Sequence, residues 1–266
     1  FENRMKLDGV FDYSDYSGFG SAQTKLTSQL ILSRNEDKFD WSLSAQKITD
    51  LSDEAFVGVG RFAGVERLPE LAVTSDTARL GGIMPFGVAA QMKFSYGRFS
   101  EVAARDAVDR TFLQINSPVT KHLLSETWSL LAGAGFRQYV YGDDTAQYAL
   151  DASAELSKNI GPTSTLALTY RYQRPNGYTP FRFDYVGRYN IVNARVDVKR
   201  EERLKLSLLA GYNFEQRGFP WQDAVLRLSY QPTGSLLLYT ATAYDFNRSR
   251  WRTLINQLRI RAGDEF

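Results

Sequence analysis

The 266 residues include 32 basic and 30 acidic side chains spread along the chain, and this balance excludes the electrostatic footprint of a nucleic-acid-binding protein. Because the chain has no cysteine and a single histidine, disulfides, thiolate metal sites and multi-histidine metal clusters are also excluded. Aromatic residues make up 14% of the chain although its mean hydropathy is −0.34, and no stretch reaches the ~18 apolar residues that a transmembrane helix needs.

Apolar and polar residues alternate along the first part of the chain, most clearly over residues 5–13, 38–46 and 88–96. Successive side chains of a β-strand point to opposite faces, so each run has one apolar and one polar face. The pattern predicts strands here. Residues 55–66 are ambiguous about which face is apolar, and Gly64–Leu71 reads as a short link before a strand.

The alternation is cleanest in the second half of the chain, over residues 128–137, 146–156, 165–173, 204–215 and 223–231. Turn-forming or charged residues separate these runs, at positions 158–162, 174–177, 199–203 and 232–235. Residues 101–110 alternate poorly and predict a longer loop, whereas 236–246 are ambiguous about their apolar face. We therefore expect these runs to be strands joined by short connections.

The spacing of the runs predicts an all-β fold of one domain, residues 1–266. At about 20 residues per strand and connection, the chain holds about 12–14 strands, each close to the ~9–11 residues that cross a bilayer. Long strands with short turns are typical of an antiparallel up-and-down meander. The predicted fold class is therefore an antiparallel transmembrane β-barrel, which this chain forms alone or as part of a larger barrel.

The direction of the apolar face decides between a membrane barrel and a soluble one. A lipocalin-type barrel hides its apolar face inside, but it closes with about eight strands, fewer than expected here. Tyrosine and phenylalanine gather at the ends of the runs, as in the aromatic girdles of outer-membrane proteins. A β-sandwich is the remaining alternative, although its strands are usually shorter. We expect a location in the bacterial outer membrane, with these residues facing lipid: Leu150, Ala152, Ala154, Leu166, Leu168, Leu206 and Leu208.

The opposite faces carry charged residues that are expected to line a watery lumen. One interpretation is that they keep the lumen wet and form cross-strand ion pairs. The other is that they form a path for a charged cargo or a surface for a plug. The predicted lumen residues are Lys93, Arg137, Asp151, Glu155, Arg171, Lys205, Glu215 and Arg227.

Catalytic, cofactor and metal sites are not predicted from this sequence, so we do not expect an enzyme. His122 is the only histidine, and a structural role fits it better than that of a catalytic base. The pair Asp143–Asp144 reads as part of a turn, because no spaced set of oxygen ligands follows it for calcium.

Several segments resemble the barrel of the lipopolysaccharide-assembly outer-membrane proteins, the organic-solvent-tolerance family. Gly64–Leu71 contains the sequence Arg-Leu-Pro-Glu, which precedes a strand in that family, and Thr179–Asp184 and Asn190–Val198 are similar to its later strands. The spacing of strands and tyrosines over Asn213–Asp245 is similar too. The resemblance implies a large barrel that inserts lipopolysaccharide into the outer leaflet, with a plug lipoprotein in its lumen and periplasmic bridge proteins as partners.

The first functional expectation is therefore an outer-membrane translocon for lipopolysaccharide or a related glycolipid, present here as a fragment. The alternative is a passive diffusion porin for small hydrophilic solutes, and a barrel-borne enzyme is the third class. A porin should show a long inward-folding loop with acidic residues facing basic ones, and residues 101–110 are the candidate. Because Ala262–Glu265 reads as a turn, we expect further strands to follow and the 266 residues not to close a barrel alone.

Overall fold

The computed structural model describes residues 5–18, 21–51, 64–82, 89–101, 106–201 and 203–260. These residues form 14 strands and one 3₁₀ turn, Arg182–Asp184. The strands are β1 (Met5–Gly18), β2 (Ser21–Asn35), β3 (Asp40–Asp50), β4 (Val65–Asp76), β5 (Gln91–Glu101), β6 (Val108–Leu123), β7 (Trp128–Tyr141), β8 (Ala146–Asn159), β9 (Thr165–Gly177), β10 (Tyr189–Arg200), β11 (Leu204–Asn213), β12 (Trp221–Thr233), β13 (Leu236–Asp245) and β14 (Arg250–Ile260).

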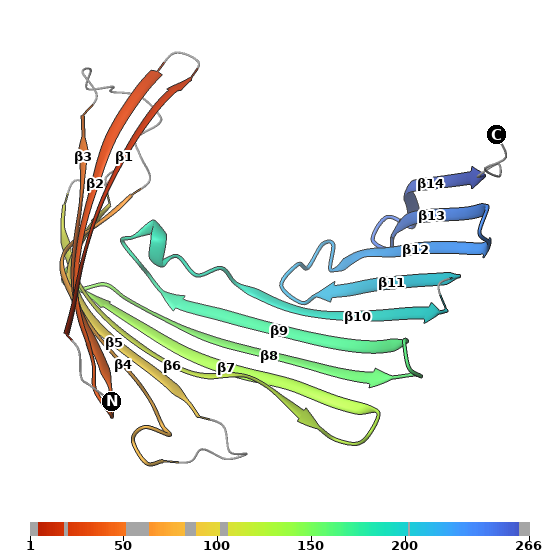
Figure 1. Cartoon of the computed structure of the whole chain (residues 1–266), viewed down its shortest axis with the longest axis horizontal. Helices are drawn as coiled ribbons and strands as arrows, with labels where there is room; N and C mark the ends of the chain where they lie inside the picture. The colour runs from red at the N-terminus through yellow and green to blue at the C-terminus, as the bar shows by residue number, and fades with distance from the viewer. Residues whose placement is uncertain are drawn as a thin grey trace. The chain divides into compact units, whose positions relative to one another are not determined.

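Each strand is hydrogen-bonded to the next one along the chain, in the order β1 to β14 (Figure 1). The strand pairs whose register is known are antiparallel, from β1 with β2 to β13 with β14. This is the predicted up-and-down meander, so the all-β antiparallel fold is confirmed. The turn expected at Ala262–Glu265 lies outside the described residues, and failure of the chain to close a barrel alone stays a prediction.

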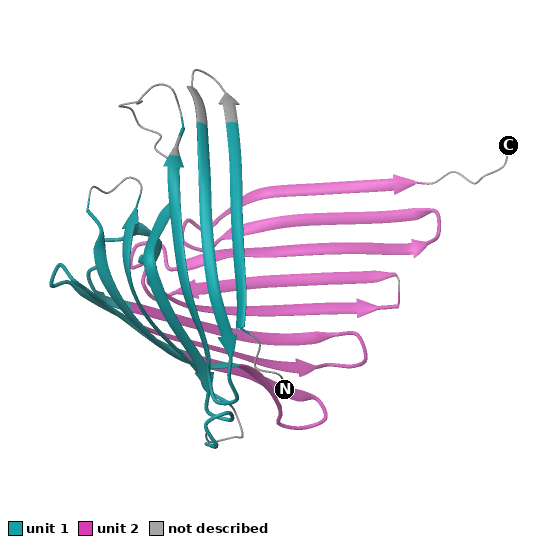
Figure 2. Ribbon diagram, turned by 60° about the vertical axis from the view of Figure 1, so that its left-hand side comes forward, with its two compact units in different colours: residues 1–118, 135–149, 175–186 teal, residues 119–134, 150–174, 187–266 magenta. Residues whose placement is uncertain are grey.

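The chain divides into two compact units (Figure 2). Unit 1 comprises residues 1–118, 135–149 and 175–186, and unit 2 comprises residues 119–134, 150–174 and 187–266. The order of strands runs through both units, and the single domain expected from the sequence stays a prediction.

Unit 1 has a continuous row of apolar side chains across its first five strands. The cross-strand register pairs Leu7 with Leu32, Leu32 with Leu43, Leu43 with Leu71 and Leu71 with Tyr96. Residues directly opposite in a sheet share a face, so this row lies on one face. Leu7 is 65% exposed and Tyr96 50% exposed, so the row lies on the surface of the unit rather than in a core.

Unit 2 repeats the same arrangement. Leu166 lies opposite Val196, Val196 opposite Leu208 and Leu208 opposite Leu226. The neighbouring row on the other face is polar, because Asp197 pairs with Ser207 and Ser207 with Arg227. A large exposed apolar face is usually an interaction surface. In membrane β-barrels built of long antiparallel strands, lipid contacts this face. This exposed apolar face agrees with the location in the bacterial outer membrane that the sequence predicts.

One β-bulge interrupts β4 and corrects the interpretation of Gly64–Leu71 as a link. Arg67 pairs with Phe99 and Glu70 pairs with Gly97, so β4 has one more residue than β5 in this interval. Proline lacks the N–H that a ladder needs, and a bulge is one of the few strand positions that accept it. The Leu-Pro sequence therefore sits inside a strand that begins at Val65, not before it.

Other predicted connections have mixed outcomes. The turns expected at 199–203 and 232–235 are confirmed, since β10 ends at Arg200 and β12 ends at Thr233. The turn expected at 174–177 is wrong, because β9 continues to Gly177. The ambiguous 236–246 segment forms β13. Of the loop expected over 101–110, Glu101 belongs to β5 and residues 108–110 belong to β6, whereas residues 102–105 lie outside the described residues. Residues 52–63 lie outside the described residues.

A helix that could span a membrane is not found among the residues that the structure describes. The main buried hydrophobic cluster belongs to unit 1 and contains Phe99, Phe112, Tyr139, Tyr141, Ala149, Phe181 and Val186. It lies on the face opposite the exposed apolar row, since Gly97 and Phe99 alternate with Tyr96 along β5.

Candidate functional site

The connection after β9 folds onto the polar face of unit 1. Within this 178–186 loop, Phe181 is 2% exposed and both Asp184 and Val186 are buried. Gly177 begins the change of direction with a φ of +94°, and a Cβ there would collide with the Ala146 carbonyl. The Tyr178 N–H donates to that same carbonyl at 2.9 Å, so the loop starts in close contact with β8.

Aromatic rings hold the loop on the sheet. The Phe181 ring centre lies 5.7 Å from that of Tyr141 and 6.3 Å from that of Phe99, both in edge-to-face geometry. Phe183 stacks on Phe181 at 4.9 Å. Contacts of this kind add to the free energy gained by burying the rings. A further tie comes from the Phe183 N–H, which donates to Glu101 Oε1 at 3.0 Å.

An ion pair lies beneath the loop. Arg110 Nη2 is 2.8 Å from Asp184 Oδ1, and the Tyr141 hydroxyl donates to Asp184 Oδ2 at 3.0 Å. Glu70 Oε1 lies 3.9 Å from Arg110 Nη1, and Arg67 Nε lies 3.5 Å from Glu70 Oε2. Acidic and basic groups from the loop and from β4 and β6 therefore meet at one place.

The Arg110 guanidinium is also surrounded by rings. Its central carbon lies 4.8 Å from the ring centre of Phe99, 5.1 Å from that of Phe112 and 5.2 Å from that of Tyr139. A cation within ~6 Å of a ring face is attracted to it, more strongly when both are out of water. Because Arg110 is only 9% exposed, its positive charge is stabilised by these rings and by the carboxylates of Asp184 and Glu70 rather than by water.

The electrostatics of Asp184 result from opposing effects. Burial raises the pKa of the Asp184 carboxyl above its usual range, while the adjacent Arg110 cation and the Tyr141 hydroxyl act to lower it. Arg110 is thus the main group that compensates the cost of placing this charge beneath the loop.

The predicted lumen residues are divided between the two units. In unit 1, Lys93 pairs with Gln114 on the face that carries Ser95 and Gly97, and Arg137 precedes Tyr139 by two residues. In unit 2, Glu155 accepts from the Thr169 hydroxyl at 3.1 Å, so these two side chains meet on one face. The other predicted lumen residues on strands are Asp151 in β8, Arg171 in β9, Lys205 in β11 and Arg227 in β12.

Glu215 is placed differently from the expectation. It lies in the turn after β11 and not on a strand, with its carboxylate 2.7 Å from Arg188 Nε. The Asn213 side-chain oxygen accepts a hydrogen bond from the Glu215 N–H at 3.0 Å. The chain turns here, so the alternation of faces along β11 does not extend to Glu215. For the strand residues, contact with a watery lumen stays a prediction.

The predicted lipid-facing residues lie on β8, β9 and β11. Leu150, Leu166, Leu168 and Leu208 are exposed, whereas Ala152, Ala154 and Leu206 are partly buried. Register places Leu206 opposite Val198 and Leu208 opposite Val196, so both leucines lie on the apolar face of β11. Contact of these side chains with lipid stays a prediction.

Sequence reasoning missed the residues that converge beneath the loop. Thr179–Asp184 resembled a strand but forms a loop with a 3₁₀ turn. The inward-folding loop considered at 101–110 lies partly outside the described residues and stays a prediction. One signal could have found the 178–186 loop. Phe181, Phe183 and Asp184 combine rings and a charge between two strands, where an exposed connection would be more polar.

Two side chains considered for chemistry have structural surroundings. His122 lies 3.0 Å from the Thr120 hydroxyl within β6. Asp143 Oδ1 accepts from the Thr145 N–H and hydroxyl at 3.1 and 2.6 Å, which confirms the predicted turn. In the described part of the chain, groups of acidic or histidine side chains that could hold a metal ion are absent.

Comparisons with known proteins find similarity to solved structures only at a distance. No family model matches the chain, and no curated protein matches it. A KdgM porin in complex with disordered oligogalacturonate is 9% identical, with a TM-score of 0.28 over 72% of this chain and 89% of that chain. A second KdgM porin structure is 10% identical, with a TM-score of 0.27 over 74% of this chain and 92% of that one.

These comparisons correct the main functional expectation. They give the predicted lipopolysaccharide translocon no support, and the two solved structures described here are porins, the class that the sequence left as its alternative. The resemblance to the lipopolysaccharide-assembly family stays a prediction, since no family model matches the chain.

Proposed function

We propose that this chain is a passive diffusion porin of the outer membrane, which lets small hydrophilic solutes cross through a polar passage narrowed by the 178–186 loop. The observation that carries the proposal is the buried Arg110–Asp184 ion pair, which fastens that loop to the polar face of unit 1. The geometry of this chain supports it, independently of the distant similarity to porins.

The two faces of the strands explain why a polar passage is needed. Lipid can cover the exposed apolar face, but the opposite face carries unlike charges and amides that need water or polar partners. Lys93, Gln91 and Gln114 lie on that face in unit 1. A large barrel leaves a water-filled interior because side chains cannot fill it.

The 178–186 loop would limit the size of the solutes that pass. A segment that folds onto the polar face takes up space there, and the charges of Arg110 and Asp184 beneath it contribute to the local electric field. Asp184 on the loop faces Arg110 on β6, with Glu70 on the other side of the guanidinium. Because this pair is in direct contact and buried, its part in the proposal is to hold the loop on the polar face rather than to contact the solute.

The proposal includes no catalysis and no cofactor. The plug lipoprotein and the periplasmic bridge proteins belonged to the translocon interpretation and are not part of it. The partner that it retains is outer-membrane lipid, which would cover side chains such as Leu7 and Leu208.

Swelling of lipid vesicles tests the proposal directly. Vesicles that contain the refolded full chain should swell in solutions of small sugars, with rates that fall steeply as the sugar becomes larger. Phe181→Ala removes the most buried ring of the loop and should raise the rate for the larger sugars. Tyr185→Ala is the matched control, because Tyr185 lies in the same loop but is 73% exposed. Absence of swelling with the unaltered chain, although it is folded in the membrane, would refute the porin function.

A further inference from the structure

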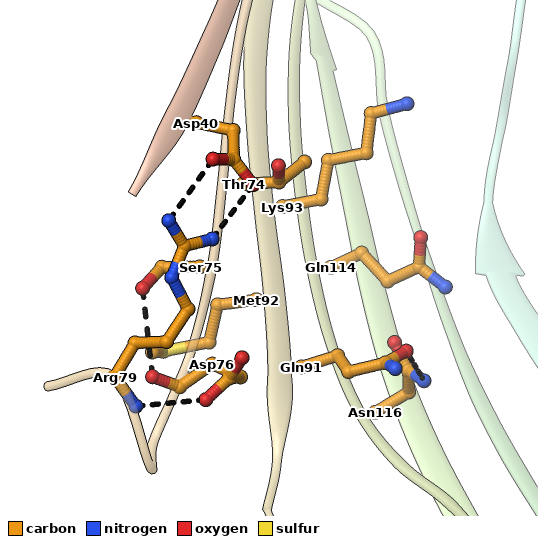
Figure 3. A pocket seen from close by; sticks show the side chains of 10 residues that line it. All are labelled: Asp40, Thr74, Ser75, Asp76, Arg79, Gln91, Met92, Lys93, Gln114 and Asn116. Atoms are coloured by element: carbon orange, nitrogen blue, oxygen red, sulfur yellow. Dashed lines mark hydrogen bonds and ion pairs between the residues drawn. The ribbon is translucent and has the colours of Figure 1, made fainter. Parts of the chain in front are cut away.

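A second polar feature lies on the strands of unit 1, beyond the 178–186 loop and its ion pair. A groove of about 400 Å³ is lined by the ends of β3, β4 and β5, by the middle of β6 and by the turn after β4 (Figure 3). Its charged residues are two carboxylates, Asp40 and Asp76, and two cations, Arg79 and Lys93, so its net charge is zero. Such a groove does not select ions of one sign, but it can select a solute that carries both signs.

Two of these four charges neutralise each other. The Arg79 guanidinium donates to both Asp40 carboxylate oxygens, at 2.6 and 2.9 Å, and also to the Asp37 carbonyl at 3.2 Å. A bidentate contact of this kind holds the guanidinium in a fixed orientation. Arg79 and Asp40 therefore leave Asp76 and Lys93 as the charges that a solute can reach.

Asp76, at the end of β4, keeps part of its carboxylate available to the groove. Its Oδ1 accepts from the Arg79 backbone N–H at 2.9 Å, and within the described part of the chain its Oδ2 accepts no hydrogen bond. A carboxylate can accept about four hydrogen bonds through its two oxygens. The contact with the Arg79 N–H therefore leaves Asp76 able to bind an ammonium group.

Lys93, in β5, is the available cation. Its ammonium lies 5.9 Å from the Phe112 ring centre, and no carboxylate of the described residues is in ion-pair contact with it. The side chain is exposed, so its flexible four-carbon stem can turn toward a solute in the groove.

The register of β4 and β5 sets the spacing between these two groups. Asp76 pairs with Gln91, which is two residues before Lys93 in β5. Asp76 and Lys93 are therefore diagonal neighbours on one face, and such neighbours lie about 7–8 Å apart. An α-amino acid holds its ammonium nitrogen roughly 2.5 Å from its carboxylate carbon, so with a charge-assisted hydrogen bond at each end it spans roughly 8 Å. The spacing fits one such solute between the two side chains.

Amide side chains complete the lining of the groove. Lys93 lies directly opposite Gln114, and Gln91 lies directly opposite Asn116. Asn116 Nδ2 donates to Gln91 Oε1 at 3.1 Å, so these two amides are held together (Figure 3). Amides both donate and accept hydrogen bonds, so they can contact either end of a dipolar solute without favouring one sign of charge.

We infer that this groove is a binding site for small zwitterions, in particular α-amino acids with short side chains. Asp76 binds the ammonium and Lys93 binds the carboxylate. The inference rests on the proposed porin function, for which it names a class of preferred solute. Because the groove is open to water, both contacts are weak enough for the solute to leave again, as conduction requires.

Binding is measured by saturation-transfer NMR on the refolded full chain in micelles of an uncharged detergent. The pH is about 6, so that amino groups are protonated and carboxyl groups are ionised. Alanine, which carries both charges, is compared with alaninamide, which keeps only the ammonium, and with N-acetylalanine, which keeps only the carboxylate. Alanine should bind about fivefold more tightly than either, the effect of one exposed ion pair.

Two variants should remove the preference for alanine in different ways. With Lys93→Gln, alanine should bind no more tightly than alaninamide. Asp76→Asn keeps an acceptor for the Arg79 N–H, and with this variant alanine should bind no more tightly than N-acetylalanine. Lys38→Gln and Asp12→Asn are the matched controls, because both residues lie outside the lining of the groove, and should leave the preference for alanine intact.

The inference is overturned if the unaltered chain binds alanine no better than the two singly charged probes, or if either variant keeps the preference. Vesicle swelling distinguishes this failure from that of the porin function. A chain that binds alanine through Asp76 and Lys93 but causes no swelling keeps the site and loses the porin function. A chain that causes swelling but binds the three probes alike keeps the porin function and loses the site.

Discussion

Replacing Arg110 with methionine should release the 178–186 loop from the sheet. Methionine fills similar space among Phe99, Phe112 and Tyr139 but carries no charge. The change leaves the Asp184 and Glu70 carboxylates, which are 4% and 8% exposed, without the cation between them. Removing one partner of a buried ion pair costs about 3–5 kcal/mol. Even ~3 kcal/mol would reduce the equilibrium constant for loop docking by a factor of ~150.

Cysteine labelling can measure this docking equilibrium, because the chain has no cysteine of its own. Val186→Cys places a thiol at a position that is 5% exposed when the loop is docked. Its rate of reaction with a maleimide, divided by the rate for Tyr185→Cys in the same background, reports the undocked fraction. This ratio should rise strongly when Arg110→Met is added.

Arg98→Met is the matched control for the loss of a cation from the same sheet. Arg98 follows Gly97, the register partner of Arg110, but its side chain is exposed and points to the opposite face. The control should leave the labelling ratio unchanged. If Arg110→Met labels Val186→Cys as slowly as the unaltered chain does, the ion pair does not hold the loop and the argument fails.

Acid should restore docking in the Arg110→Met variant. Burial raises the pKa of the Asp184 carboxyl in the docked loop, and the variant lacks the cation that opposes this shift. For a carboxyl with a raised pKa, docking is most favourable below the undocked value of ~3.9 and is lost as the pH rises through the docked value. The labelling ratio should therefore fall as the pH is lowered from about 7 to about 4. A ratio independent of pH would contradict the assignment of the effect to Asp184.

Two further predictions concern the strands. Leu208→Arg should destabilise the chain by about 2–4 kcal/mol in urea titrations in lipid vesicles, since an arginine near the bilayer midplane costs this much, whereas Ser207→Arg on the polar face should cost little. Equal effects of the two substitutions would contradict the assignment of the faces. Gly97→Ala should cost about 1–3 kcal/mol, because its Cβ would lie 2.6 Å from the Pro69 carbonyl oxygen, whereas Gly9→Ala meets nothing closer than 4.0 Å. A Gly97→Ala variant that is as stable as the unaltered chain and keeps the sheet register would contradict this prediction, because the backbone of the bulge would then have moved to make room for the methyl group.

The period of two was sufficient to predict most of the fold. Runs such as 146–156 and 165–173 alternate because one face meets an apolar environment and the other a polar one, and that constraint acts residue by residue along a single strand. The structure forms β8 and β9 over both runs. Local pattern also predicted the turn that separates β10 from β11.

The candidate site could not be predicted in the same way. Asp184 and Arg110 are separated by 74 positions, and their contact depends on where a loop lies after nine strands have paired. The rings and the charge around Asp184 mark the loop as unusual, but they do not indicate its partner, since Arg110 is one of several charged residues near the start of β6. Burial of charge is a property of the assembled sheet, so the pattern of one strand could not indicate it.

Because of the bulge in β4, the number of residues in this strand decides whether Arg67 and Glu70 lie on the same face of the sheet. Arg67 and Glu70 differ by an odd number of positions, yet the extra residue brings their side chains to within 3.5 Å of each other. Deleting Leu68 would give β4 the same count as β5 and a more regular ladder. Alternation would then carry either Arg67 or Glu70 to the lipid face. Relatives that differ by a single-residue gap here would thus carry a different charge beside Arg110, even if their strands aligned everywhere else.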